Sequence, residues 1–409
     1  MREDLRRIRR EIAERLDGSD YSDRMLLSQI DRALTEWGRD QRLSLKEKEA
    51  CRKQLLDSFR GMDILQPLLE DEEVTEIMVN GPFSIFVEKG SEMIAWERHF
   101  TGREPLDDVI QGMAASVNRI VNTATPIADL RLEDGSRVNI VLPPAAPDGP
   151  VVTIRKFFKD PLTMEKLLEK EALSQACADY LKSAVKCGCN IFISGGTGSG
   201  KTTFLNALSA YIPAEERVIT IEDSLELQLQ GLSNLVRLET RNPNLEGSGK
   251  ISIRDLIRTA LRMRPNRIVV GEVRGEEALD MLQAMNTGHR GSLSTGHANS
   301  AAHMLSRLET MTLMGGDLPL GAVRNQIASA LDILVHLGRL KDRKRRVLSV
   351  HEMRGLEKGE ICLEAIFEYK AGTGLLFTGR QPESTEKWKE IYEAVPRFDE
   401  EGNFFLQPV

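Results

Sequence analysis

Residues 190–213, NIFISGGTGSGKTTFLNALSAYIP, constrain the fold of this chain more than any other stretch. The first residues are apolar and predict a buried strand, which runs directly into a glycine-rich turn. The turn, residues 195–202, matches the pattern G-x-x-x-x-G-K-[ST], and helical apolar spacing follows it. This order predicts a phosphate-binding loop, because the glycines let backbone N–H groups point inward at the start of a helix.

The side chains of such a loop have separate tasks. Lys201 would reach the β- and γ-phosphates, and the hydroxyl group of Thr202 would bind Mg²⁺. ATP is the expected nucleotide by elimination, because the N-K-x-D element of GTPases needs an Asn-Lys pair and the sequence has none. The predicted nucleotide-binding residues are Gly195, Gly196, Thr197, Gly198, Ser199, Gly200, Lys201, Thr202 and Thr203.

Acidic residues follow two other strand-like segments of the same region. Glu222 and Asp223 follow RVITI, and Glu272 follows RIVVG. Parallel strands bring their carboxyl ends to one edge of a sheet, where ligands bind, and a P-loop enzyme needs an acid there. Since Gly271 stands where an aspartate usually precedes this glutamate, we interpret Glu272 as the base that polarises water and Glu222 with Asp223 as the metal side. A solvated loop acid is the alternative for each.

Two of the six histidines fall within the segment GHRGSLSTGHANS. His297 follows the strand-like GSLST and is expected at the same edge as the acids, whereas His289 precedes that strand. A contact of His297 with the γ-phosphate or with water is the functional interpretation, and a structural histidine fits the sequence equally well. A metal pair is disfavoured, because neither a carboxylate nor a cysteine stands at ligand spacing beside them.

The chain has 409 residues, which is more than one typical domain. Its composition is mixed, and 55 basic against 62 acidic side chains leave a net charge of -7. This balance argues against stable binding of nucleic acid, which favours a basic surface. No apolar run approaches the ~20 residues that span a bilayer, no signal peptide is visible, and the five scattered cysteines are typical of reduced thiols. We therefore expect a cytoplasmic protein.

Patterning divides the chain into five predicted parts. Strands alternate with helices in the largest part, which predicts a parallel sheet and an α/β fold. The parts are a helical appendage (1–60), an α+β domain (61–158), a linker (159–173), the α/β domain (174–350) and a strand-rich extension (351–409).

Local signals support the helical appendage. Leu5, Ile8 and Ile12 recur at helical spacing, and Gly18 is expected to end that helix. Ser44 and Glu47 form a plausible capping box for a later helix.

Two basic segments remain open. Arg254, Arg258 and Arg262 lie at i, i+4 and i+8, which predicts either a solvated helix face or a contact with a neighbouring subunit's site. The run KDRKRR at 341–346 predicts an exposed turn, or a surface for an acidic membrane or a platform protein.

The order of GGTGSGKT, TIEDSLEL, VVGEVRG and TGHANS resembles the secretion-ATPase superfamily, which powers type II and type IV secretion and type IV pilus machines. These stretches look like its Walker A, Asp box, atypical Walker B and His box. VTEIMVNGP and LRLEDGSRVNIVLPP are also similar, so the resemblance covers roughly residues 60–350. Within the superfamily, the chain most resembles the tight-adherence (Tad/Flp) pilus assembly ATPases of the CpaF type. The four-cysteine zinc insertion of the type II branch has no counterpart here.

The resemblance implies a RecA-like motor domain, a homo-hexamer, and ATP held between the N-terminal and motor domains. It also implies two arginines that approach the γ-phosphate, and Arg137 and Arg155 match their positions. A guanidinium can fork across phosphate oxygens, although the residues alone would equally suit a strand surface. The implied partner is an inner-membrane platform protein of a pilus or secretion machine, which would place the chain peripherally at the inner face of the cell membrane.

The leading hypothesis is a hexameric ATPase that powers Tad/Flp pilus assembly or type II/IV secretion. A DNA-translocating conjugation-type ATPase is an alternative that the acidic balance disfavours. A P-loop phosphotransferase for a small molecule would need a lid with arginines and no ring. A non-hydrolysing scaffold is disfavoured by the presence of both Lys201 and Glu272.

Overall fold

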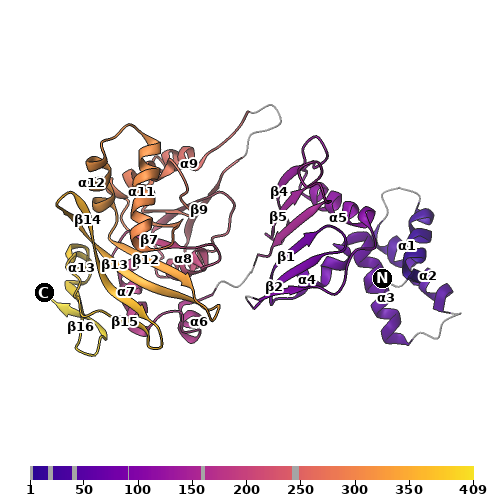
Figure 1. Cartoon of the computed structure of the whole chain (residues 1–409), viewed down its shortest axis with the longest axis horizontal. Helices are drawn as coiled ribbons and strands as arrows, with labels where there is room; N and C mark the ends of the chain where they lie inside the picture. Colours follow the sequence, from indigo (N-terminus) through magenta and orange to yellow (C-terminus); the bar gives the residue numbers. More distant parts are fainter. Residues whose placement is uncertain (1–2, 17–21, 39–43, 91, 158–161, 242–247) are drawn as a thin grey trace. The chain divides into compact units, whose positions relative to one another are not determined.

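A computed structural model describes residues 3–16, 22–38, 44–90, 92–157, 162–241 and 248–409 (Figure 1). Contacts divide the chain into two compact units, Met1–Lys159 and Asp160–Val409. Each unit has its own hydrophobic cores and is described by itself.

The first unit begins with three helices: α1 (Glu3–Leu16), α2 (Asp23–Gly38) and α3 (Leu45–Arg60). Leu5, Ile8 and Ile12 are buried in a core that these helices share, which confirms the predicted helical face. The capping box is also confirmed, because Ser44 Oγ accepts a hydrogen bond from the backbone N–H of Glu47 and the Glu47 side chain returns to the Ser44 backbone. Gly18 lies outside the described residues.

The rest of this unit is an antiparallel sheet covered by helix α5 (Arg103–Ser116). The sheet order is β3-β2-β1-β6-β5-β4. Its strands are β1 (Val74–Asn80), β2 (Ile85–Lys89), β3 (Glu92–Ala95), β4 (Ile127–Arg131), β5 (Arg137–Val141) and β6 (Val151–Arg155), and the short helices η1 (Asp63–Leu65) and α4 (Gln66–Glu70) precede them. The predicted hairpin at Asp134-Gly135 joins β4 to β5. Gly135 is required there, since its φ is 90° and a Cβ would lie 2.9 Å from the Phe157 ring.

The second unit is built on a nine-stranded sheet of order β15-β14-β13-β12-β7-β11-β10-β8-β9. The six strands from β12 to β9 in this order are parallel, as predicted, and the other three extend the sheet antiparallel. The parallel strands are β7 (Ile191–Gly195), β8 (Arg217–Glu222), β9 (Asn234–Glu239), β10 (Arg267–Val270), β11 (Leu293–His297) and β12 (Ile333–Arg339). The antiparallel strands are β13 (Arg345–Glu357), β14 (Glu360–Lys370) and β15 (Gly374–Phe377).

Helices cover both faces of this sheet, because its central strands are apolar on both sides. In β7, Ile191 and Ile193 belong to one core and Phe192 belongs to the other. The first core is completed by α6 (Met164–Glu169), α7 (Gln175–Lys186), α8 (Lys201–Ser209) and α13 (Glu386–Tyr392). The second is completed by α9 (Ile253–Ala260), α10 (Glu277–Asn286), α11 (Ala301–Gly315) and α12 (Leu320–Ala330).

A buried ion pair fixes the starts of two adjacent strands in this sheet. Arg267, at the start of β10, is only 1% exposed, and its guanidinium donates two hydrogen bonds to the Glu216 carboxylate just before β8. It also donates to the carbonyl oxygen of Val185 at 2.6 Å. A buried arginine needs such partners, since an unpaired charge in a core is costly.

Two predicted boundaries meet continuous structure. Helix α6 lies inside the range expected to be a linker, and its Met164 and Leu167 are buried in the core of the second unit. Strand β13 continues from Arg345 to Glu357, across the predicted start of the extension at 351. The division into five parts stays a prediction.

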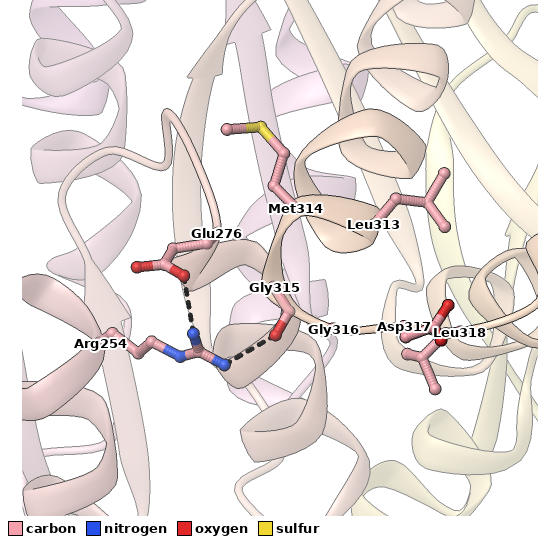
Figure 2. Close-up of a pocket in the computed structure, with 8 residues that line it drawn as sticks. All are labelled: Arg254, Glu276, Leu313, Met314, Gly315, Gly316, Asp317 and Leu318. Carbon is pink, nitrogen blue, oxygen red and sulfur yellow. Dashed lines mark hydrogen bonds and ion pairs between the residues drawn. The ribbon is translucent and has the colours of Figure 1, made fainter.

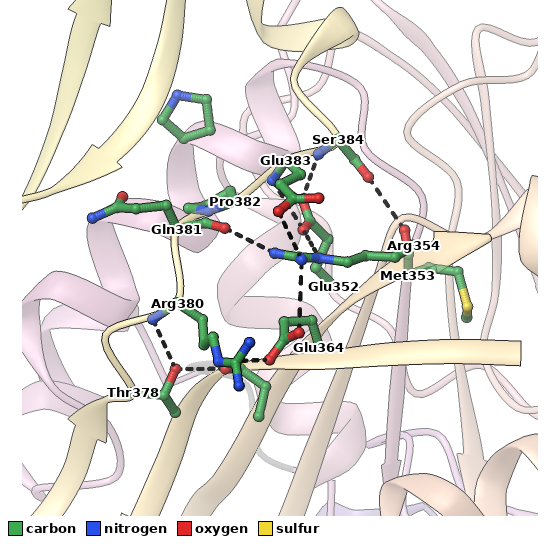
Figure 3. A network of polar contacts seen from close by, with 12 residues as sticks. Glu352, Met353, Arg354, Glu364, Thr378, Arg380, Gln381, Pro382, Glu383 and Ser384 are labelled. Atoms are coloured by element: carbon green, nitrogen blue, oxygen red, sulfur yellow. Dashed lines mark hydrogen bonds and ion pairs between the residues drawn. The ribbon is translucent and has the colours of Figure 1, made fainter. Parts of the chain in front are cut away.

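The C-terminal segment is held to the sheet by a buried carboxylate (Figure 3). Glu352 on β13 is 2% exposed and accepts hydrogen bonds from the backbone N–H groups of Glu383 and Ser384. Arg354 pairs with both Glu352 and Glu364, which lies on β14. Beyond this network the chain adds α13 and the two-stranded sheet of β16 (Ala394–Phe398) and β17 (Phe404–Pro408).

Candidate nucleotide site

The P-loop follows β7 directly and leads into α8, as the sequence predicted. Gly198 and Gly200 have φ angles of 70° and 91°, a region that favours glycine. Gly195 is required for a different reason, because a Cβ there would lie 2.5 Å from the carbonyl oxygen of Leu337. Glycine therefore occupies these three positions because the backbone there has a positive φ or touches a neighbouring strand.

Lys201 lies folded over the loop. Its side chain is mostly hidden, with the residue 7% exposed, and Nζ donates to the carbonyl oxygens of Gly195 and Gly196 at 3.2 and 3.1 Å. Nζ also lies 3.2 Å from Nδ1 of His297. These contacts hold the ammonium group over the loop, where the lysine of this motif binds phosphates.

A chain of close polar contacts continues from His297 along the same edge of the sheet. His297 Nε2 lies 2.7 Å from Oε1 of Glu272, and the other oxygen of Glu272 accepts from Arg274 at 2.8 Å. Arg274 lies 3.6 Å from a carboxylate oxygen of Asp223. The predicted meeting of these strand ends is confirmed, because β11 pairs with both β7 and β10.

The contact between His297 and Glu272 is close without having hydrogen-bond geometry. Oε1 of Glu272 is buried and accepts no hydrogen bond from the described residues. Burial lowers the pKa of His297, and Lys201 and Arg274 lower it further, while Glu272 acts in the opposite direction. The imidazole is therefore neutral at pH 7, and a buried carboxylate oxygen beside it is open to a donor such as water.

Glu222 and Asp223 lie in different surroundings. Glu222 is 3% exposed, and its Oε2 accepts the backbone N–H groups of Glu226 and Leu227 at 2.7 and 2.9 Å. A Cβ on Gly271 would lie 2.9 Å from Cγ of Glu222. Position 271 thus has no side chain because Glu222 fills that space, and the alternative of a solvated loop acid is wrong for Glu222. Asp223 is exposed.

The protein oxygens at this site suit an Mg²⁺ ion whose other ligands are phosphate and water. The described residues hold no cluster of three His, Cys, Asp or Glu side chains that could bind a metal ion. Mg²⁺ at phosphate sites uses one or two protein oxygens together with phosphates and water, so no such cluster is needed. The half-exposed Thr202 hydroxyl at the start of α8 fits this requirement.

In the first unit, Arg137 and Arg155 are cross-strand neighbours. The register of β5 and β6 places them directly opposite each other, and the register of β4 and β5 places Arg131 opposite Arg137. Arg155 also lies 3.7 Å from Glu76 on β1. The sequence does not predict Arg131 at this place, because a two-residue turn at Asp134-Gly135 would put Leu132 opposite Arg137, whereas the loop has three residues.

The predicted arginine stripe of α9 is not a free cationic face. Arg254 pairs with Asp280 and Glu276 at 2.7 Å, and Arg258 pairs with Asp280 at 2.8 Å. Arg262 lies beyond the end of the helix at Ala260. The sequence could not show this, because Asp280 lies on α10.

Arg254 and Glu276 also line a shallow pocket with the end of α11 (Figure 2). Arg254 donates to the carbonyl oxygen of Gly315 at 2.8 Å across this pocket. None of the residues predicted for the nucleotide site lines it.

The five cysteines are free, and burial raises the pKa of Cys187 to about 12. Within the part of the chain that the structure describes, the helices are too short or too polar to cross a membrane.

The parallel sheet, the P-loop and the acids at its strand ends define the second unit as a RecA-like P-loop ATPase domain. The family model for "Type II/IV secretion system protein" matches residues 59–376, and the chain belongs to this family. Several relatives of this chain are named as type IV secretion system proteins.

Three known proteins illustrate the relationship. A Mycobacterium tuberculosis protein named for conjugal transfer is 34% identical over 327 residues, which cover 78% of this chain and 92% of that protein. The type IV secretion system protein PtlH homolog of Bordetella bronchiseptica is 36% identical over 325 residues, or 72% of this chain and 95% of that one. The structure of the Yersinia pseudotuberculosis ATPase DotB matches with a TM-score of 0.53 at 18% identity, over 71% of this chain and 77% of that one. This structural likeness supports the fold alone.

Proposed function

We propose that this ATPase assembles as a homo-hexameric ring and powers Tad/Flp pilus assembly, or type II/IV secretion, through an inner-membrane platform protein. The resemblance of its four motifs to CpaF-type ATPases supports the pilus assignment, and the family match supports the wider class. In this proposal the protein works in the cytoplasm, at the inner face of the membrane, and is held there by its partners.

The proposed chemistry assigns the phosphates to the P-loop and the water to Glu272. Lys201 exchanges the carbonyl oxygens of Gly195 and Gly196 for oxygens of the β- and γ-phosphates. Thr202 would hold Mg²⁺, which would supply positive charge beside the phosphates, and Glu222 and Asp223 are assigned to the metal side. The backbone N–H groups of residues 195–203 hold the remaining phosphate oxygens.

Hydrolysis then transfers one proton to the protein. The oxygen of a water molecule attacks the γ-phosphorus, its proton passes to Oε1 of Glu272, and the bond to the bridging oxygen of ADP breaks. His297, which is neutral, orients this water or contacts the γ-phosphate. Arg137 and Arg155 stabilise the charge that develops on the γ-phosphoryl group. Movement of the N-terminal domain would thereby be coupled to turnover.

One observation supports this assignment best: Oε1 of Glu272 is buried, lacks a hydrogen-bond donor among the described residues, and lies 2.7 Å from a neutral histidine that touches Lys201. Glu272→Gln should keep ATP binding and lower phosphate release by about 10²–10⁴-fold, because the amide cannot take the proton. Glu215→Gln, the same substitution at an exposed site, is the control. Normal release by Glu272→Gln would remove Glu272 from this role.

Assembly is tested by mass and activity together. If a ring completes the sites, specific ATPase activity should rise with protein concentration in step with a hexameric mass in solution. A flat activity profile from a monomer would contradict the ring.

A conjugation-type ATPase remains the second candidate, and the name of the Mycobacterium tuberculosis relative is the observation that favours it. The net charge of -7 counts against it. Double-stranded DNA that raised turnover many-fold at moderate salt would support this candidate over the pilus or secretion motor.

A further inference from the structure

A basic hairpin passes beside the P-loop. Strand β12 pairs in parallel with β7, with Leu337 opposite Gly195 at the end of that strand. It continues two residues further to Arg339, which pairs with Arg345 at the start of β13. The hairpin between them, residues 339–345, therefore begins two residues beyond the level of Gly195, the first residue of the P-loop.

The cations that flank Arg345 have partners of their own. Lys344 lies 3.2 Å from Glu171, and Arg346 lies 3.8 Å from the same carboxylate. Arg346 also pairs with Asp342 at 2.7 Å, and its guanidinium lies 5.8 Å from the centre of the Tyr369 ring. Both neighbours are thus turned toward Glu171. Since side chains alternate along a strand, Arg345 faces the other way.

Arg345 is turned toward the phosphate-binding loop. Its Cδ lies 3.5 Å from the position of a Cβ built on Gly200, which is ordinary van der Waals contact. Gly200 is the N-cap of α8, and the next residue is Lys201. Within the described chain no hydrogen bond or ion pair engages the Arg345 guanidinium, and the residue is exposed. An extended cation thus lies against the loop with no acid beside it.

We propose that Arg345 binds the phosphates of the nucleotide from the hairpin side of the P-loop. The proposal rests on the proposed nucleotide site and adds a residue to it. The N-terminus of α8 attracts anions through its N–H groups and its dipole. A guanidinium adds a full charge and several donors, which suit phosphate oxygens.

This contact is one of binding and not of catalysis. Arg345 lies beside Gly200 at the base of the loop, where ADP and ATP present the same phosphates. It holds substrate and product alike, and such uniform binding changes affinity without changing the maximal rate. Arg345 therefore differs in role from Arg137 and Arg155, which are proposed to act on the charge of the transition state.

The experiment compares the full-length Arg345→Ala, Arg345→Lys and Lys344→Ala variants by calorimetric titration with Mg-ADP and with Mg-pyrophosphate. Arg345→Ala should bind both about tenfold more weakly, while kcat at saturating ATP stays within about twofold. Arg345→Lys should recover most of the affinity, because it keeps the charge. Lys344→Ala removes a neighbouring charge that pairs with Glu171, and it should bind like the wild type.

Two results would overturn the proposal. Unchanged affinity of Arg345→Ala would show that the guanidinium does not reach the ligand. Weaker binding of ADP with unchanged binding of pyrophosphate would show a contact with the base or ribose instead. The Lys201→Ala variant tests the proposed nucleotide site separately from the role of Arg345. If Lys201→Ala binds Mg-ADP as the wild type does, the nucleotide does not bind at the P-loop.

Discussion

Basic side chains have different neighbours in the large sheets of the two units. In the second unit acids lie beside the basic groups: Glu216 holds Arg267, Glu272 lies between His297 and Arg274, and Asp280 holds Arg254. In the first unit Arg131, Arg137 and Arg155 lie opposite one another across three adjacent strands. Like charges in this position cost stability.

The difference indicates what each arrangement is for. In the pair of Arg267 with Glu216, the carboxylate accepts hydrogen bonds from a buried guanidinium, and the pair links the starts of two adjacent strands. Three arginines in neighbouring register positions bring positive charge together on one sheet, which suits binding of a polyanion such as a triphosphate. Local rules of stability are commonly broken at functional sites. The comparison therefore supports the assignment of Arg137 and Arg155 to the phosphate.

Removing an acid from the paired region should have the largest effect on stability. Glu216→Ala leaves the Arg267 guanidinium buried without its carboxylate, which should lower the free energy of unfolding by about 3–5 kcal/mol. Chemical denaturation followed by circular dichroism measures this. A loss below about 1 kcal/mol would mean that water replaces the carboxylate and that this pair does not hold the strands.

A methyl group at Gly271 should have a smaller effect. Gly271→Ala places a Cβ 2.9 Å from Cγ of Glu222, whose carboxylate is held by two backbone N–H groups and cannot easily move. The free energy of unfolding should fall by about 1–3 kcal/mol. Gly321→Ala in α12 is the matched control, because its Cβ would meet nothing within 4 Å. Equal stability of the two variants would show that Glu222 does not fill the space at position 271.

Removing a cation from the row of three arginines should have the smallest effect on stability. Arg137→Ala removes one of three neighbouring positive charges, so the free energy of unfolding should change by less than about 1 kcal/mol. The same denaturation experiment without nucleotide measures it. A loss of stability comparable to that of Glu216→Ala would show that the three arginines stabilise the fold as the Arg267–Glu216 pair does.

The dependence of stability on pH should sharpen the account of His297. Burial holds its pKa below the usual value of 6.5, so below that pH the unfolded chain binds a proton that the folded chain does not. Stability is therefore lost as pH falls through 6.5. His297→Asn should lose less stability than the wild type between pH 7.5 and 5.5, in denaturation curves at both values. Identical losses would contradict a neutral, buried His297.

The sequence predicted those features that depend on neighbouring residues. Residues 190–213 specified the strand, the loop and the helix, and apolar strands followed by acids placed Glu272 at the correct edge. It could not predict features that depend on distant partners. Arg254 pairs with Asp280, which lies on another helix. Arg345 cannot be told apart from its basic neighbours in the sequence, whereas in the structure Lys344 and Arg346 lie beside Glu171 and Arg345 does not.

Short elements were missed for a related reason. Helix α6 has six residues, which is too short to show helical periodicity, and so the sequence predicts a linker over its range. The Thr163 side chain at its N-cap was the one local signal. The sequence alone does not distinguish Glu222 from Asp223, because they are adjacent acids. At the end of the strand Glu222 is buried and Asp223 is exposed.

The central claim is that arginines of the N-terminal domain act on ATP held by the P-loop, and steady-state kinetics with ATP titration of the Arg137→Ala/Arg155→Ala variant test it most directly. The account predicts that kcat falls by about 10³–10⁵-fold while the Kd for ATP changes by less than about tenfold. Turnover that persists at the wild-type rate, or a loss confined to affinity, would contradict it.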